Sequence, residues 1–356
     1  MILAVTNGKI WTGDRFIDGS VVAEDGMIEC VGEDSDGLIG QADRVFDASG
    51  GIVCPGLVDI HIHMRHISDS IYGVSAELAC VPFGVTAAAE AAACFFKREV
   101  ADSVIVKNKV FVCTEIKNNT VDFTPTELLL DEYGDRAIGL KVFFSSSKHT
   151  MDTKPLKKVC SYARAKGLKV LVHCTSSPSP FAEIVDCLSA GDIITHAFHG
   201  APNSCDADDF EAIENAQAKG VIIDVGMAGG VHCDFSIAKK ALDNGVLPNT
   251  VSSDIVKRSA YWRGGRYGLT ACMSIMRALG MSEAAVLKAV TSSAAEAIGL
   301  GDICGRLAVG RPADIAVLKN RDGAIDVTDS WGNRLNVSNG YRCMLTVADG
   351  EIVYGD

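Results

Sequence analysis

The chain has 356 residues, 48% of them hydrophobic and 22% charged, which is the composition of a globular protein with a sizeable core. Its formal net charge of −12 argues against a nucleic-acid partner, and no apolar run is long enough to span a membrane, so we expect neither as a partner. The 13 cysteines are scattered and odd in number, so we expect reduced thiols, no leader segment and a cytoplasmic location.

Short β-rich segments separated by turn residues occupy both ends of the chain. They cover residues 2–5, 9–11, 20–23 and 27–31 at the start, and 314–318, 343–348 and 351–354 at the end. Pairs such as Asn7-Gly8 and Asp349-Gly350 between them are typical of hairpin turns. Two similar ends around a different middle predict one small β-sandwich domain built from residues 1–53 and 305–356.

Residues 54–304 alternate apolar strands with amphipathic helices. Eight strand candidates lie at 57–61, 85–89, 110–114, 138–143, 169–173, 193–196, 221–225 and 250–254. Continuous apolar runs are typical of parallel strands buried on both faces, and eight such units in about 250 residues match a closed barrel. The fold class that we predict is therefore α/β, a (β/α)₈ TIM barrel. An open doubly wound sheet is the alternative, but no glycine-rich phosphate motif follows the first strand.

Polar side chains stand where several of these strands end. The segment DIHIH at 59–63 puts His61 and His63 on one face of the first strand, because side chains alternate along a strand. Lys141 lies in the apolar run of the fourth strand, where an amine is costly to bury unless it is paired or chemically changed. The fifth, sixth and eighth strands end in His173, His196 and Asp254.

Each of these residues alone has a structural alternative: histidines that only hydrogen-bond, a lysine that extends to the barrel mouth, or a surface aspartate. Together they indicate one site, because the carboxyl ends of barrel strands converge on a single pocket. Four of the 8 histidines fall at these ends. Imidazole and carboxylate are common ligands of Zn²⁺ and related ions, so the pattern predicts a metal site.

Longer motifs resemble the amidohydrolase superfamily, in particular its dihydroorotase-like and deacetylase-like members. They are DASG at 47–50, PGLVDIHIH at 55–63 and GRLAVGRPADI at 305–315, and the resemblance spans nearly the whole chain. It implies two divalent metal ions; we expect Zn²⁺, although Mn²⁺, Fe²⁺, Co²⁺ and Ni²⁺ accept the same ligands.

The resemblance also implies a role for each strand-end residue. His61, His63 and Asp254 would hold the first ion, His173 and His196 would hold the second, and a carboxylated Lys141 would bridge the two. Asp254 would in addition be the catalytic residue that takes a proton and delivers it to the leaving group.

Three further residues are candidates for substrate binding. Arg65 follows His63 as in dihydroorotases, and a guanidinium pairs well with a carboxylate; its alternative is a salt bridge to a loop acid. His199 stands where related sequences often carry asparagine, and His232 follows the seventh strand. Each of these histidines would either contact the substrate or only stabilise a loop.

The resemblance implies a hydrolase that cleaves an N-acyl or O-acyl bond of a small, carboxylate-bearing molecule, as deacetylases do. A cyclic amide hydrolase of the dihydroorotase or hydantoinase type is the alternative, although the segment AAAEA at 87–91 lacks the asparagine motif of dihydroorotases. A barrel that has lost catalysis and serves as a scaffold is disfavoured by the complete set of ligands. The apolar composition is compatible with a homo-oligomer.

Overall fold

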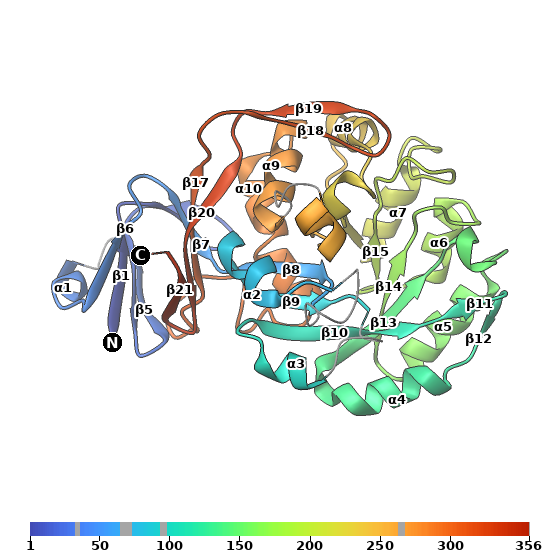
Figure 1. The fold of residues 1–356 in the computed structure, drawn as a ribbon, viewed down its shortest axis with the longest axis horizontal. Helices are drawn as coiled ribbons and strands as arrows, with labels where there is room; N and C mark the ends of the chain where they lie inside the picture. Colours follow the sequence, from blue (N-terminus) through green and yellow to red (C-terminus); the bar gives the residue numbers. More distant parts are fainter. Residues whose placement is uncertain (33–35, 65–72, 93–97, 263–267, 356) are drawn as a thin grey trace.

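The computed structural model of the chain describes residues 1–32, 36–64, 73–92, 98–262 and 268–355. Two parts are visible in Figure 1: a sheet-rich part at the left, which holds both termini, and a larger part at the right, in which helices surround a curled sheet. Among the described residues, no helix is both long enough and apolar enough to cross a membrane.

The curled sheet has seven strands, all paired in parallel with their neighbours. In chain order they are β8 (Leu57–Ile62), β9 (Val85–Glu90), β10 (Lys107–Thr114), β13 (Ala137–Phe143), β14 (Lys169–His173), β15 (Ile193–Thr195) and β16 (Ile222–Asp224). Spatial order follows chain order, as in a singly wound barrel.

An irregular segment closes the barrel in place of the predicted eighth strand at 250–254. Single parallel bridges join Thr250 to Asp224 of β16 and Ile255 to Ile62 of β8. No regular ladder forms because the Ser253 amide donates to the Asp59 carboxylate and Asp254 adopts a left-handed backbone with φ of 45°. The predicted (β/α)₈ barrel is therefore confirmed, with its eighth strand reduced to bridges.

Helices cover the outside of this barrel. They are α2 (Ala76–Ala79), α3 (Arg98–Ser103), α4 (Thr124–Tyr133), α5 (Lys154–Ala165), α6 (Phe181–Cys187), α7 (Glu211–Ala218), α8 (Phe235–Asp243), α9 (Leu269–Leu279), α10 (Glu283–Ala289) and α11 (Ser292–Ala297). In α5 the residues Leu156, Val159, Cys160 and Ala163 are buried, and this spacing of three and four residues forms one apolar stripe facing the sheet.

The barrel interior holds its own apolar layer. Phe111, Leu171 and Ile193 come from three different strands and belong to one buried cluster, which also includes Ala294 of α11. Gly139 leaves room for this layer, since a Cβ at this position would lie 2.7 Å from the Phe111 ring. The layer fills one end of the barrel, so polar side chains gather at the other.

Two further sheets are built from the ends of the chain: the four-stranded one uses N-terminal strands alone, and the six-stranded one combines strands from both ends. One has the order β5-β4-β1-β6 and the other β21-β20-β17-β7-β2-β3. Their strands are β1 (Ile2–Thr6), β2 (Lys9–Trp11), β3 (Phe16–Ile17), β4 (Ser20–Glu24), β5 (Met27–Gly32), β6 (Arg44–Asp47), β7 (Ile52–Pro55), β17 (Ile315–Asn320), β20 (Tyr341–Ala348) and β21 (Glu351–Tyr354); α1 is Asp36–Ile39. One apolar cluster contains residues of both sheets. The predicted boundaries of this part remain a prediction.

A hairpin of β18 (Ile325–Thr328) and β19 (Arg334–Val337) leaves the terminal sheets and packs on the barrel. At its tip, the Asp329 carboxylate accepts a hydrogen bond from the Phe235 amide at the start of α8, at 2.8 Å. The Ser330 amide donates to the Gly230 carbonyl at 3.0 Å. A C-terminal segment therefore supports the loop between β16 and α8.

Candidate active site

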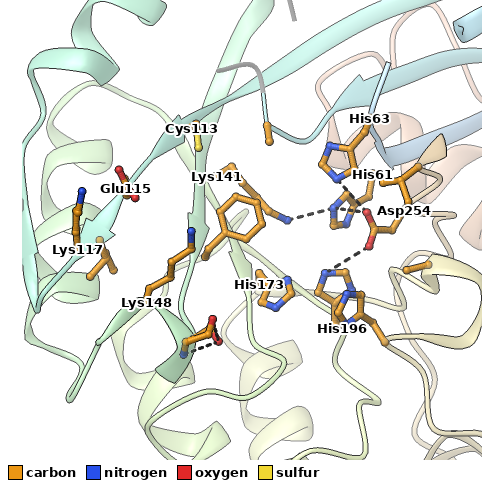
Figure 2. A pocket seen from close by; sticks show the side chains of 18 of the residues that line it. His61, His63, Cys113, Glu115, Lys117, Lys141, Lys148, His173, His196 and Asp254 are labelled. Carbon is orange, nitrogen blue, oxygen red and sulfur yellow. Dashed lines mark hydrogen bonds and ion pairs between the residues drawn. The ribbon is translucent and has the colours of Figure 1, made fainter. Parts of the chain in front are cut away.

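The six predicted metal ligands meet in one cavity of about 1120 Å³ at the carboxyl ends of the barrel strands. They are His61, His63, Lys141, His173, His196 and Asp254. Figure 2 shows Lys141, His173 and His196 directed towards His61 and Asp254. Lys141 is fully buried, and His61 and His196 are each 1% exposed, so water has little access to the inner end of the cavity.

Asp254 binds the first pair of histidines through one carboxylate oxygen. Its Oδ1 lies 3.3 Å from His61 Nε2 and 3.0 Å from His63 Nε2, and Oδ2 lies 3.9 Å from His196 Nε2. Burial by itself raises the pKa of the Asp254 carboxyl, but the neighbouring His61 and His63 hold this pKa well below its usual range. The carboxylate is therefore ionised and able to bind a cation or accept a proton.

Backbone strain is concentrated at two of these residues. His196 has φ of 65° and Asp254 has φ of 45°, both in the left-handed region that side chains other than glycine rarely adopt. Such a residue costs roughly 1–3 kcal/mol and persists where the surroundings hold it in place, which is common at functional sites. Gly226 supports His196, because a Cβ at this position would lie 2.5 Å from the imidazole Nδ1.

Glu90 is a site residue that the sequence analysis missed. It ends β9 and is fully buried, and its carboxylate accepts hydrogen bonds from the Met64 and Ala92 amides at 2.5 and 3.1 Å. Its Oε1 also lies 3.3 Å from His63 Nδ1. Burial by itself lowers the pKa of His63, but Asp254 and Glu90 together raise this pKa to about 9. An acid at the end of an apolar strand was the signal that could have identified it.

Asp224 is a second missed residue, and it acts on His61 through Thr195. The fully buried Asp224 carboxylate accepts hydrogen bonds from the hydroxyls of Thr195, Ser252 and Thr250 at 2.7, 2.7 and 2.9 Å. Thr195 Oγ1 also lies 2.8 Å from His61 Nδ1. Because the only hydroxyl proton of Thr195 goes to Asp224, the hydroxyl oxygen accepts from His61 Nδ1–H. The Nε2 of His61 is therefore left as the nitrogen with a free lone pair.

Lys141 extends from β13 to this same nitrogen, with Nζ 3.2 Å from His61 Nε2. Burial is the main cause that lowers the pKa of the Lys141 amine, to about 8. About a tenth of the amine is therefore neutral at pH 7, and a neutral amine is the form that reacts with an electrophile.

His173 and His196 form a second group with His232, in which the potential ligand atoms lie within 4.8 Å of one another. His196 Nδ1 donates to the Gly226 carbonyl at 2.7 Å, which leaves Nε2 with its lone pair. Burial lowers the pKa of all three histidines, so they are neutral. The other group is His61, His63 and Asp254. Imidazoles and one carboxylate are the donor set of a divalent transition ion, so the residues fit such an ion.

The three residues predicted to bind substrate have different positions. His232 lines the cavity, whereas the fully buried His199 is not among its lining residues and accepts a hydrogen bond from the Ala201 amide at 3.2 Å. Arg65 lies outside the described residues. The outer part of the cavity is lined by Lys117 and Lys148, which the sequence analysis did not single out (Figure 2).

Comparisons with known proteins agree with this arrangement. A deacetylase of Agrobacterium fabrum, Atu3266, is 28% identical over 94% of this chain and 86% of its own length. The crystal structure of a dihydroorotase superposes with a TM-score of 0.83 at 24% identity, covering 100% of this chain and 98% of its own. That of an adenine deaminase has a TM-score of 0.84 at 22% identity, with 99% of both chains covered. At these identities the two structures establish the fold.

The family model described as "Amidohydrolase family" matches residues 52–339, which include the whole barrel and every residue of the two potential metal groups. The chain therefore belongs to the amidohydrolase family and is a hydrolase acting on carbon–nitrogen bonds.

Proposed function

We propose that the protein is a metal-dependent deacetylase-like hydrolase, which cleaves an N-acyl or O-acyl bond of a small molecule carrying a carboxylate. The observation that carries this proposal is the meeting of two groups of potential metal ligands in one cavity. The likeness to a deacetylase along 94% of the chain supports the choice of reaction.

His61, His63 and Asp254 would hold one ion, and His173 and His196 the other, with Zn²⁺ the metal we expect. When bound, two such ions would supply Lewis acidity, which polarises the scissile carbonyl and lowers the pKa of a water molecule. Glu90 and the Asp224–Thr195 pair hold the Nδ1 atoms of His63 and His61, so that both Nε2 atoms face the cavity.

Lys141 would act as the bridge after carboxylation. Its neutral amine would attack CO₂, forming a nitrogen–carbon bond, and the amine proton would leave to solvent, so that a carbamate anion remains. The lowered pKa of the Lys141 amine, about 8, supports this step because the reacting form is accessible near neutral pH. An anion at this position would also offset the cost of burying a cationic side chain.

Asp254 would carry the proton during hydrolysis. Its carboxylate is ionised and lies at the inner end of the cavity, beside the histidines of the first group. In this position Asp254 would accept a proton from the attacking water and deliver it to the departing nitrogen or oxygen, a role that typically contributes about 10²–10⁴-fold in rate.

The outer cavity supports an anionic substrate. Lys117 and Lys148 line it, both are exposed, and neither side chain has a hydrogen-bond or ion-pair partner among the described residues. Arg65, two residues after His63 in the sequence, would be a further cation for the substrate carboxylate, and His199 and His232 stay proposed substrate contacts. The protein would work on small molecules in the cytoplasm, an expectation that the scattered and odd number of cysteines supports.

A cyclic amide hydrolase remains the second candidate, because the same side chains would serve ring opening and the fold is shared with a dihydroorotase. An acetate-release assay on N-acetyl and O-acetyl carboxylates, run beside a ring-opening absorbance assay on dihydroorotate and hydantoins, separates the two. Acetate release without ring opening would support the deacetylase-like function. Ring opening without acetate release would show instead that the protein is a cyclic amide hydrolase.

Metal analysis tests the metal-dependent part of the proposal. We expect about two ions per wild-type chain, as in other two-metal hydrolases, and a sharp fall in Lys141→Gln. Lys148→Gln is the matched control, since this lysine lines the same cavity but is exposed. Wild-type protein without metal would overturn the proposal, and an unchanged content in Lys141→Gln would overturn the bridge.

A further inference from the structure

The imidazole of His232 lies directly beside those of His173 and His196. Its ring centroid is 4.2 Å from that of His196 and 5.1 Å from that of His173. The rings of His173 and His196 are themselves 4.5 Å apart. Each imidazole thus neighbours the other two.

Hydrogen bonds orient these imidazoles. His232 Nδ1 lies 3.0 Å from the Thr175 hydroxyl, and His196 Nδ1 donates to the Gly226 carbonyl at 2.7 Å. The other nitrogens, Nε2 of His232 and Nε2 of His196, have no hydrogen-bond partner among the described residues, and neither does either ring nitrogen of His173. Three imidazoles whose potential ligand nitrogens lie within 4.8 Å of one another can each present a lone pair to one cation.

Hydrogen bonds on both sides of His232 fix the position of the loop that carries it. It follows η4 (Ala228–Gly230), and the Gly230 carbonyl accepts a hydrogen bond from the Ser330 amide of the β18–β19 hairpin at 3.0 Å. Two residues after His232, the Asp234 amide donates to the Phe198 carbonyl at 2.8 Å. The loop is therefore tied on both sides of His232, which favours a ligand with fixed geometry over an adaptable substrate contact.

We infer that His232 is a third protein ligand of the second metal ion, beside His173 and His196, with Thr175 holding its Nδ1. The inference rests on the proposed metal-dependent function and assigns His232 a role other than substrate binding. The second ion then has three protein donors of its own, the number that a zinc site with one open position needs. Its binding does not depend on carboxylation of Lys141.

Measuring metal affinity in two backgrounds tests this assignment. His232→Asn is made in the wild type and in Lys141→Gln, with His149→Asn as the matched control, because His149 is exposed and is not among the residues that line the cavity. Metal content is measured by mass spectrometry, Zn²⁺ affinity by competition with a chromophoric chelator, and the Co²⁺ coordination by visible absorption.

Adding His232→Asn to Lys141→Gln should lower the metal content further, and the Zn²⁺ dissociation constant of the second site should rise at least about 100-fold. The Co²⁺ spectrum of the wild type should change in His232→Asn and stay unchanged in His149→Asn. If His232→Asn fails to fold, Thr175→Val decides, since loss of the Nδ1 partner should raise the dissociation constant about tenfold.

An unchanged dissociation constant and Co²⁺ spectrum in His232→Asn, or in Thr175→Val where only that variant folds, would overturn the inference. The proposed hydrolase would be unaffected by this result, because the wild type would still bind metal. Conversely, wild-type protein that binds two ions but releases no acyl group would overturn the proposed reaction and leave the ligand assignment standing.

Discussion

Replacing Thr195 with valine should weaken metal binding while the barrel still folds. The hydroxyl of Thr195 donates to Asp224 at 2.7 Å and accepts from His61 Nδ1 at 2.8 Å, so it links a buried carboxylate to a proposed metal ligand. Valine has nearly the same shape but no hydroxyl. In the variant the His61 Nδ1–H has no acceptor. The imidazole then lowers its free energy by rotating or by moving its proton to Nε2, the nitrogen that should bind metal.

Thr250→Val is the matched control for this change. The Thr250 hydroxyl also donates to Asp224, at 2.9 Å, and Thr250 is as fully buried as Thr195, but it has no hydrogen bond to His61. Each variant loses one hydrogen bond to the Asp224 carboxylate, which lowers the free energy of unfolding by about 1.5–3 kcal/mol, and Thr195→Val also loses the hydrogen bond from His61. Only Thr195→Val should also raise the metal dissociation constant, by about 10–100-fold, as outer partners of metal ligands commonly do. That range equals about 1.4–2.7 kcal/mol of binding free energy.

Two measurements on each variant separate the effects. Urea unfolding in the presence of a chelator measures the stability of the metal-free protein, and chelator competition measures Zn²⁺ affinity. Similar losses of stability with a selective loss of affinity in Thr195→Val would support the link from Asp224 to His61. The same dissociation constant in both variants would refute it, because the hydroxyl would then serve only the stability of the barrel.

Three further predictions concern neighbouring residues. Asp254→Asn should lower turnover by about 10²–10⁴-fold while metal content stays near that of the wild type; a matching loss of metal would show that Asp254 acts mainly as a ligand. Gly226→Ala should lower the free energy of unfolding by more than about 2 kcal/mol, because the added Cβ overlaps Thr195 and His196 and because φ is 52°. Gly245 is the control, since its φ is 82° and a Cβ there would meet open space. In the same urea titration, Gly245→Ala should show the backbone cost alone. The pKa of the Lys141 amine is lowered to about 8, so the amine loses its proton as pH rises through that value. Under a fixed partial pressure of CO₂, reactivation of metal-free protein by Zn²⁺ should therefore accelerate between about pH 6 and 8 and level off above, and a pH-independent rate would contradict this.

Local patterns in the sequence were enough to predict the barrel and the strand-end residues that meet in its cavity. Parallel strands buried on both faces leave continuous apolar runs, so a polar residue at the end of such a run is visible without a structure. His61, His63, Lys141, His173 and His196 were found in this way. Their convergence followed from the topology, because all strands of a barrel end on the same side.

Hydrogen-bond partners could not be predicted in the same way. Asp224 and Glu90 also end apolar strands, but what they do depends on which side chains face them across the barrel. Thr195 and His61 are far apart in the chain, and the sequence contains no mark of their contact. The irregular eighth segment likewise depends on a side chain, since the Asp59 carboxylate takes the Ser253 amide that a regular strand would pair.

The sequence by itself determined the fold class, the family and the residues that stand at the mouth of the barrel, because these follow from periodicity and from motifs that are continuous in the chain. The tertiary structure decided the partner of each imidazole nitrogen, the position of His232 beside His173 and His196, and the support of its loop by Ser330. Such contacts join segments that are distant in sequence, and only closure of the barrel and packing of the β18–β19 hairpin bring them within reach of a hydrogen bond.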